Sequence, residues 1–234
     1  MQTFEQAAIV TGGTRGFGRG IAEALAKAGY TTRTVARGEE ADIVADAAEP
    51  GVAERVLTEH AHAPVVVVLN AGAIPDTAPV HEQTWESFTA PWEVDVRQAF
   101  EWTRAALRQP LAPGSVVVLL SSGAALGGSP RSGGYAGAKA MVRFIARYAG
   151  EESERLGLGI RFVALLPGLS PGTGVGDAGA RAYAAKQGIS VEEFRARLGP
   201  VVTPEIAGQA VLDVLGRPGA PAFTVSAAGL GEIQ

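Results

Sequence analysis

Short aliphatic runs recur along this chain, separated by stretches with helical periodicity, and this alternation narrows the possible folds more than any other feature. The runs occupy residues 7–10, 31–36, 43–45, 65–69, 116–120, 160–166 and 222–225. Several are continuously apolar instead of alternating with polar residues, which is typical of strands covered on both faces, as in parallel sheets. The pattern predicts an α/β fold: a doubly wound parallel, Rossmann-like sheet of about seven strands with helices on both faces.

A single domain over residues 1–234 is expected, because the chain has one domain's length and neither a linker nor a repeat interrupts the pattern. Thr203 as an N-cap and Gly216 as a stop mark one helix well. The connection over 37–46 is too short for the usual helical crossover and predicts a shortened loop. The Gly-rich start and two short predicted helices of 170–200 indicate a substrate lid.

Charge and composition exclude several classes of function. The net charge of −4, without any block of like charge, argues against nucleic acid and membrane surfaces as partners. The absence of cysteine excludes disulfides and thiol chemistry. No metal site is expected, since His60 and His62 lie two apart and His81 stands alone. Residues 1–6 lack the features of a signal peptide, so a cytoplasmic location is expected.

A glycine-rich segment, TGGTRGFG over residues 11–18, directly follows the first aliphatic run. At a strand-to-helix turn, glycines let backbone N–H groups approach a pyrophosphate that sits at the helix N-terminus. The spacing is G-x3-G-x-G, and taken alone it also fits a turn that binds nothing.

Further motifs follow in order over residues 7–168. Asn70-Ala71-Gly72 comes after the fourth run, and Ser122 lies thirteen residues before Tyr135. Tyr135 begins a Y-x3-K motif, and Pro167-Gly168 ends the sixth run. Together with the glycine-rich turn, these motifs make the chain similar to the compact, single-domain branch of the short-chain dehydrogenase/reductase family.

The resemblance implies a nicotinamide cofactor and assigns residues to it. The implied cofactor-binding residues are Gly12, Arg15, Gly16, Phe17, Gly18, Arg37, Asp46, Asn70, Ala71, Gly72, Lys139, Pro167 and Gly168. In the family, the Asp that corresponds to Asp46 contacts adenine; the alternative is an ordinary aspartate at a strand end.

Catalysis is assigned to Ser122, Tyr135 and Lys139, with Asp95 in question. A free tyrosine, with a pKa of ~10, relays protons poorly near neutrality. Lys139 lies one helical turn from Tyr135, where its charge would stabilise the phenolate. Ser122 would place a hydroxyl on the substrate oxygen. The alternatives are a solvated helix face for the pair and a turn residue for the serine.

Asp95 departs from the family, which has Asn at the matching position, where it holds a water beside the lysine. A carboxylate accepts hydrogen bonds but lacks the amide donor. It would also pair with Lys139 and weaken that cation's pull on Tyr135. Either the relay works with a carboxylate, or activity is reduced or altered.

The sequence favours NADP over NAD. NAD-preferring relatives carry an acidic residue after the second strand, and Ala36 occupies that position. Arg37 and Arg15 suit a 2′-phosphate, whose oxygens match the planar guanidinium. Glu39 and Glu40 stay open as ligands of the ribose diol.

The predicted function is NADP(H)-dependent hydride transfer between nicotinamide and a carbonyl or secondary alcohol. The alternatives are a nucleotide-binding regulatory protein with weakened catalysis and a same-fold epimerase or dehydratase. By resemblance, segments 91–108 and 136–156 would pack against a second subunit, giving a homodimer or homotetramer. The sequence does not identify the small-molecule substrate.

Overall fold

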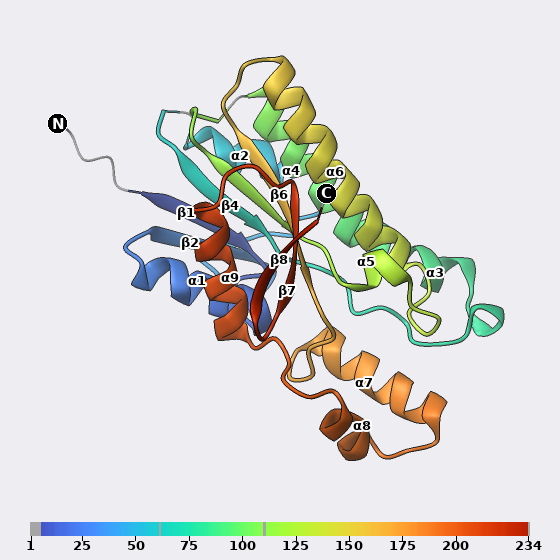
Figure 1. The fold of residues 1–234 in the computed structure, drawn as a ribbon. Helices are drawn as coiled ribbons and strands as arrows, with labels where there is room; N and C mark the ends of the chain where they lie inside the picture. Colours follow the sequence, from blue (N-terminus) through green and yellow to red (C-terminus); the bar gives the residue numbers. More distant parts are fainter. Residues whose placement is uncertain (1–5, 61, 110, 234) are drawn as a thin grey trace.

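A computed structural model describes residues 6–60, 62–109 and 111–233. Residues 1–5, on which the expectation about location largely depends, lie outside the described part. The chain forms one sheet with the strand order β3-β2-β1-β4-β5-β6-β7-β8 (Figure 1). The strands are β1 (Ala7–Thr11), β2 (Thr31–Ala36), β3 (Ile43–Val44), β4 (Val65–Leu69), β5 (Val116–Leu120), β6 (Arg161–Pro167), β7 (Ala222–Ser226) and β8 (Gly229–Ile233).

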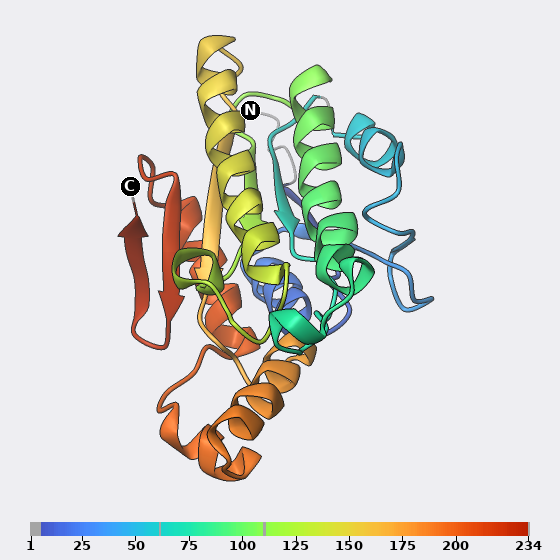
Figure 2. The ribbon, with the colours of Figure 1, turned by 90° about the vertical axis from the view of Figure 1, so that its right-hand side faces the viewer.

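Helices cover both faces of this sheet, as the sequence predicts. On one face lie α1 (Gly16–Lys27) and α9 (Pro204–Leu215). On the other lie α2 (Val52–Thr58), α4 (Arg97–Arg108) and α6 (Tyr135–Arg155). Figure 2 shows α4 and α6 running side by side in front of the sheet. The doubly wound α/β architecture is therefore confirmed.

The remaining elements gather at the carboxyl ends of the parallel strands. They are the 3₁₀ turn η1 (Val80–Glu82), α3 (Trp85–Pro91), the π-helical turn η2 (Trp92–Val96), α5 (Ala124–Gly127), α7 (Gly174–Gln187) and α8 (Val191–Arg197). In both ribbon views α7 and α8 project beyond the end of the sheet (Figures 1 and 2). This end of the sheet is where open α/β folds bind ligands, beside the point where the strand order reverses between β1 and β4.

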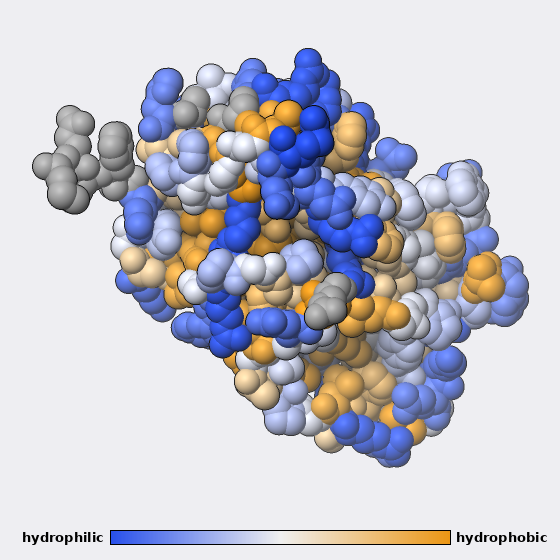
Figure 3. All heavy atoms as spheres, turned by 45° about the horizontal axis from the view of Figure 1, so that its top comes forward, coloured by the Kyte–Doolittle hydropathy of each residue, from blue (hydrophilic) through white to orange (hydrophobic). Residues whose placement is uncertain are grey.

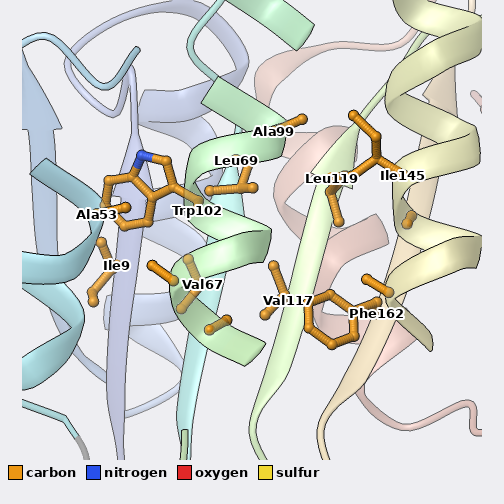
Figure 4. Packing of buried hydrophobic residues seen from close by; sticks show 14 of the residues in the cluster. Ile9, Ala53, Val67, Leu69, Ala99, Trp102, Val117, Leu119, Ile145 and Phe162 are labelled. Atoms are coloured by element: carbon orange, nitrogen blue, oxygen red, sulfur yellow. The ribbon is translucent and has the colours of Figure 1, made fainter. Parts of the chain in front are cut away.

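The core lies between the sheet and its helices. Ile9, Val67, Leu119 and Phe162 of the strands pack against helical residues that include Trp102 (Figure 4). The buried Trp102 indole also donates to the carbonyl oxygen of Ala47 at 2.9 Å, which ties α4 to the loop after β3. Outside the core, hydrophilic and hydrophobic residues are interspersed over the face shown in Figure 3.

The structure adds one strand to the predicted sheet. The eighth strand, β8, pairs antiparallel with β7 at the edge, whereas the other neighbouring strands are parallel. Its sequence, GLGEI, contains two glycines and little of the β-branched character that marks a strand. This composition explains why the aliphatic pattern predicts about seven strands.

Two local predictions are confirmed. Helix α9 begins after Thr203, whose hydroxyl accepts from the N–H of Ile206 at 3.3 Å, and it stops at Gly216. No helix occurs between β2 and β3, so this crossover is the shortened loop. Within the described ranges, no helix combines the length and apolar character needed to cross a membrane.

Candidate active site

The turn between β1 and α1 requires glycine for two different reasons. Gly12 has φ +62°, in the left-handed region, and a Cβ there would lie 2.9 Å from the Cα of Ala71. Gly18 sits behind the turn, where a Cβ would collide with the carbonyl oxygen of Gly12 and the side-chain amide of Asn70. Glycine therefore lets the helix start close to the sheet and leaves the front of the turn open.

Asn70 and Thr11 hold the ends of β1 and β4 together. The Asn70 amide donates to the carbonyl oxygens of Thr11 at 3.0 Å and Gly12 at 3.2 Å. The Thr11 hydroxyl accepts from the backbone N–H groups of Asn70 at 2.9 Å and Ala71 at 3.1 Å. Through these bonds Asn70 fixes the conformation of the glycine turn. The position of Asn70 in the sequence motif does not reveal this structural role.

Two arginines lie at the end of the site formed by β1, β2 and β3. Arg15 and Arg37 are exposed, and neither side chain makes a hydrogen bond or an ion pair within the described part of the chain. Asp46 lies at the same end, and its side chain accepts from the N–H of Ala48 at 2.9 Å. Asp46 therefore shapes its own turn and also lines the cleft.

Tyr135, Lys139 and Ser122 meet where β5 and α6 approach one another. Tyr135 is the first residue of α6, and the Lys139 ammonium lies 5.7 Å from the centre of its ring. The ammonium donates to the Leu120 carbonyl oxygen at 3.0 Å, which fixes it at the end of β5. The Ser121 hydroxyl donates to the Lys139 carbonyl oxygen at 2.7 Å and joins β5 to α6.

Asp95 faces Lys139 from the π-helical turn η2. Its carboxylate lies 3.2 Å from the Lys139 ammonium, and the side chains are only 1% and 8% exposed, respectively. The other carboxylate oxygen accepts from the N–H of Ala73 at 2.8 Å. Pro91 directly precedes η2. Because proline has no backbone N–H to donate, the α-helical hydrogen-bond pattern is interrupted at Pro91, and the π-helical turn that carries Asp95 follows. Such π turns occur frequently at functional sites.

The electrostatics of the three groups are coupled. Burial raises the pKa of Tyr135, Lys139 lowers it, and Asp95 raises it again, with a net pKa above the ordinary value. Burial alone would lower the pKa of Lys139, but the charges of Asp95 and Tyr135 outweigh it, so that the net pKa is raised. The Lys139 side chain is therefore protonated near neutral pH, and its positive charge acts on both the Tyr135 phenol and the Asp95 carboxylate.

One open cleft brings nearly all the predicted residues together. It is lined by every residue assigned to catalysis and by twelve of the thirteen residues assigned to the cofactor; the exception is Gly18. Gly18 packs α1 against the turn and does not line the cleft. In the described ranges no group of three His, Asp or Glu side chains is close enough to hold a metal ion.

Further contacts shape the cleft: those of Gln98, which no sequence pattern singles out, and those of two aromatic residues of the expected lid, Tyr183 and Phe194, whose partners the sequence does not specify. Gln98 is buried and donates to the Ala71 carbonyl oxygen at 2.9 Å, which fixes the segment after β4. Tyr183 of α7 bonds the hydroxyl of Ser129 at 2.5 Å and stacks on Phe194 of α8. These contacts join segments far apart in the sequence, and no local pattern marks them.

Comparisons with known proteins agree with this arrangement. A family model described as enoyl-(acyl carrier protein) reductase matches residues 12–217. A short-chain type dehydrogenase/reductase of Picea abies is 31% identical over 230 residues, covering 86% of this chain and 83% of that protein. The chain therefore belongs to the short-chain dehydrogenase/reductase family of oxidoreductases, which use a nicotinamide cofactor.

Two further similarities are more limited. A phthioceranic/hydroxyphthioceranic acid synthase of Mycobacterium tuberculosis is 32% identical over 161 residues, which is 60% of this chain but 7% of the synthase. The crystal structure of a variant actinorhodin polyketide ketoreductase with NADPH superposes with a TM-score of 0.78 at 24% identity, covering 95% of this chain and 96% of that one. At that identity the likeness shows the shared fold.

Proposed function

We propose that this protein is an NADPH-dependent reductase that converts a carbonyl compound to an alcohol, with Tyr135 as the proton donor. The observation that carries the proposal is the position of the Lys139 ammonium, 5.7 Å from the Tyr135 ring, in the cleft that the glycine turn also lines. A dinucleotide held at that turn would extend along the strand ends toward Tyr135. When bound, the nicotinamide supplies the hydride.

The residues of the chain supply the proton and the orientation. The Ser122 hydroxyl, beside the Tyr135 phenol in the same cleft, donates to the substrate oxygen and stabilises the charge that develops there. Tyr135 transfers its proton to that oxygen, and the adjacent Lys139 ammonium stabilises the phenolate that remains. Leu120 and Asp95 hold Lys139 in position.

The nucleotide end of the cleft fits a pyrophosphate. Helix α1 begins without a capping side chain and without an acidic residue in its first turn, so its N–H groups and partial positive charge are available to an anion. Gly12 lets the turn lie against Ala71, and Gly16 carries no Cβ on the side that faces Thr173. Gly12 and Gly16, with Asn70 behind them, would hold the cofactor.

NADPH is the proposed form of the cofactor for two reasons. NAD-dependent relatives carry an acidic residue at the position of Ala36, and Arg37, which directly follows β2, suits a 2′-phosphate. Arg37→Ala is expected to weaken NADPH binding by about 1.5–3 kcal/mol, the contribution of a charge-assisted hydrogen bond, and to change NADH binding little. Isothermal titration with both cofactors measures this difference. Arg55→Ala, an exposed arginine of α2, serves as the control. Equal losses for the two cofactors would remove Arg37 from the 2′-phosphate site.

The Asp95 carboxylate is expected to shift the pH profile of alcohol oxidation to higher pH. Asp95 raises the pKa of Tyr135, and alcohol oxidation requires the deprotonated phenol. Asp95→Asn removes this contribution, so the rising limb of the oxidation profile should move to lower pH. A pH–rate series on the wild type and the variant provides the measurement, and superimposable curves would show that Asp95 does not influence Tyr135.

Measuring NADPH consumption together with substrate conversion separates the alternative functions. A regulatory nucleotide-binding protein would bind NADPH without consuming it in the presence of any carbonyl. An epimerase or dehydratase would convert its substrate without net consumption of NADPH. The intact set of Ser122, Tyr135 and Lys139 supports the reductase.

The lid and the oligomer are part of the proposal. Several residues of the segment 170–200, among them Thr173, Tyr183 and Phe194, line the cleft, which supports the role of this segment as a lid. Exposed aromatic side chains lie on the helical segments expected to meet a second subunit: Trp92 of η2, Phe100 of α4, and Phe144 and Tyr148 of α6. They support a homodimer or homotetramer.

A further inference from the structure

Arg131 lines the cleft on the substrate side, four residues before the proposed proton donor Tyr135. The segment 128–134 connects α5 to α6 through two successive turns. The N–H of Ser132 donates to the Ser129 carbonyl oxygen at 3.3 Å, and the N–H of Tyr135 donates to that of Ser132 at 3.0 Å. At its start the Ser129 hydroxyl bonds Tyr183 of α7. Arg131 is thus held between the catalytic tyrosine and the proposed lid.

The charges that line the cleft leave Arg131 without a counterion. The lining cations are Arg15, Arg37, Arg131 and Lys139, and the lining acids are Glu40, Asp46 and Asp95. The two other arginines, with Glu40 and Asp46, lie on the segments that follow β1, β2 and β3, at the nucleotide end. Lys139 and Asp95 pair with one another. Arg131 is therefore the one charged side chain among the described lining residues that belongs to neither group.

Two polar groups beside one another lack partners at this point. Arg131 makes no hydrogen bond or ion pair to any described residue, and its Nε is buried. The neighbouring Ser132 is 9% exposed, and its buried hydroxyl also lacks a partner. A buried donor without an acceptor is costly, and most buried polar groups are hydrogen-bonded. Arg131 and Ser132 both line the cleft, so a ligand that brings acceptor oxygens to this point could satisfy them.

We propose that Arg131 and Ser132 bind a carboxylate of the substrate, which makes the substrate an oxo acid. This inference rests on the proposed function and names its substrate class. A guanidinium binds a carboxylate through two parallel hydrogen bonds, and the single charge of Arg131 matches the single charge of the acid. A phosphate monoester carries ≈ −1.5 to −2 charges and is less well matched by one arginine. The carboxylate would orient the carbonyl toward Ser122 and Tyr135.

The test compares acids with their uncharged esters. Pyruvate, acetoacetate and levulinate are each assayed against their methyl esters with NADPH, because the three acids place the carbonyl at different distances from the carboxylate. We expect kcat/KM for at least one acid to exceed that of its ester by about tenfold or more. Arg131→Gln should lower kcat/KM for that acid roughly ten- to hundredfold, mainly through KM, and leave the ester unchanged. Arg131→Lys should recover part of the loss, and Arg55→Gln should match the wild type.

A binding measurement separates this inference from the reductase proposal. The NADP-loaded protein is titrated calorimetrically with valerate, with valeramide and with inorganic phosphate. Valerate binding that is lost in Arg131→Gln and reduced in Ser132→Ala is expected, whether or not any ketone is reduced. The inference is overturned if the amide binds as well as the acid, if phosphate binds in preference, or if Arg131→Gln affects acids and esters equally. Reduction of esters in those cases would leave the proposed function standing.

Discussion

Tyr135→Phe is expected to lower kcat by about 10²–10⁴-fold, the usual contribution of a positioned general acid, while NADPH affinity stays near the wild-type value. The substitution removes only the phenolic oxygen and keeps the ring beside Lys139. Binding of the dinucleotide depends on the glycine turn and the strand ends, which the ring does not shape. Steady-state kinetics together with calorimetric NADPH binding measure both effects.

The same helix offers a matched control for this variant. Tyr148 lies on α6 and is exposed, outside the cleft, so Tyr148→Phe should leave kcat unchanged. If Tyr135→Phe keeps more than a few per cent of the wild-type kcat while binding NADPH normally, another group donates the proton.

Lys139→Met should destabilise the fold as well as stop turnover. The substitution leaves the buried Asp95 carboxylate without its cation, and removing one partner of a buried ion pair typically costs about 3–5 kcal/mol. Lys139 is also the cation that stabilises the Tyr135 phenolate, so activity should fall with stability. Urea unfolding gives the free energy of unfolding, and turnover is assayed at a temperature where the variant is folded.

A second substitution separates the two roles of Lys139. Asp95→Asn combined with Lys139→Met removes both charges, so most of the lost stability should return while activity stays absent. Lys186→Met, at an exposed position on α7, should change neither property. A Lys139→Met variant as stable as the wild type would contradict the buried ion pair, and recovery of activity in the double variant would contradict the role of Lys139 in catalysis.

Much of this architecture is predictable from the sequence because the decisive signals are local. Strands that are buried on both faces appear in the sequence as aliphatic runs. Because these strands pair in parallel, their carboxyl ends lie at one edge of the sheet. Motifs that follow separate strands, such as Asn70-Ala71-Gly72 and Ser122, must therefore converge. The one strand missed, β8, has two glycines and lies at the antiparallel edge, where packing decides pairing more than composition does.

The finer geometry of the cleft depends on tertiary contacts that spacing cannot supply. The sequence places Asp95 in a helical segment, but the π turn that brings it to 3.2 Å from Lys139 has no such signature. Gly18 fits the cofactor motif equally well, yet its position behind the turn follows from the approach of Asn70. The unpaired state of Arg131 is visible only when every neighbouring acid has been located.

Hydride transfer itself is tested most directly with NADPH that carries deuterium at the transferable nicotinamide position. The labelled cofactor is incubated with the protein and a panel of ketones, aldehydes and oxo acids, and the products are examined by mass spectrometry. We expect an alcohol with one deuterium on the former carbonyl carbon, formed in equal amount to the NADP produced, and no such product with Tyr135→Phe. Substrate conversion without deuterium in the product, or tight NADPH binding with no conversion of any carbonyl, would contradict it.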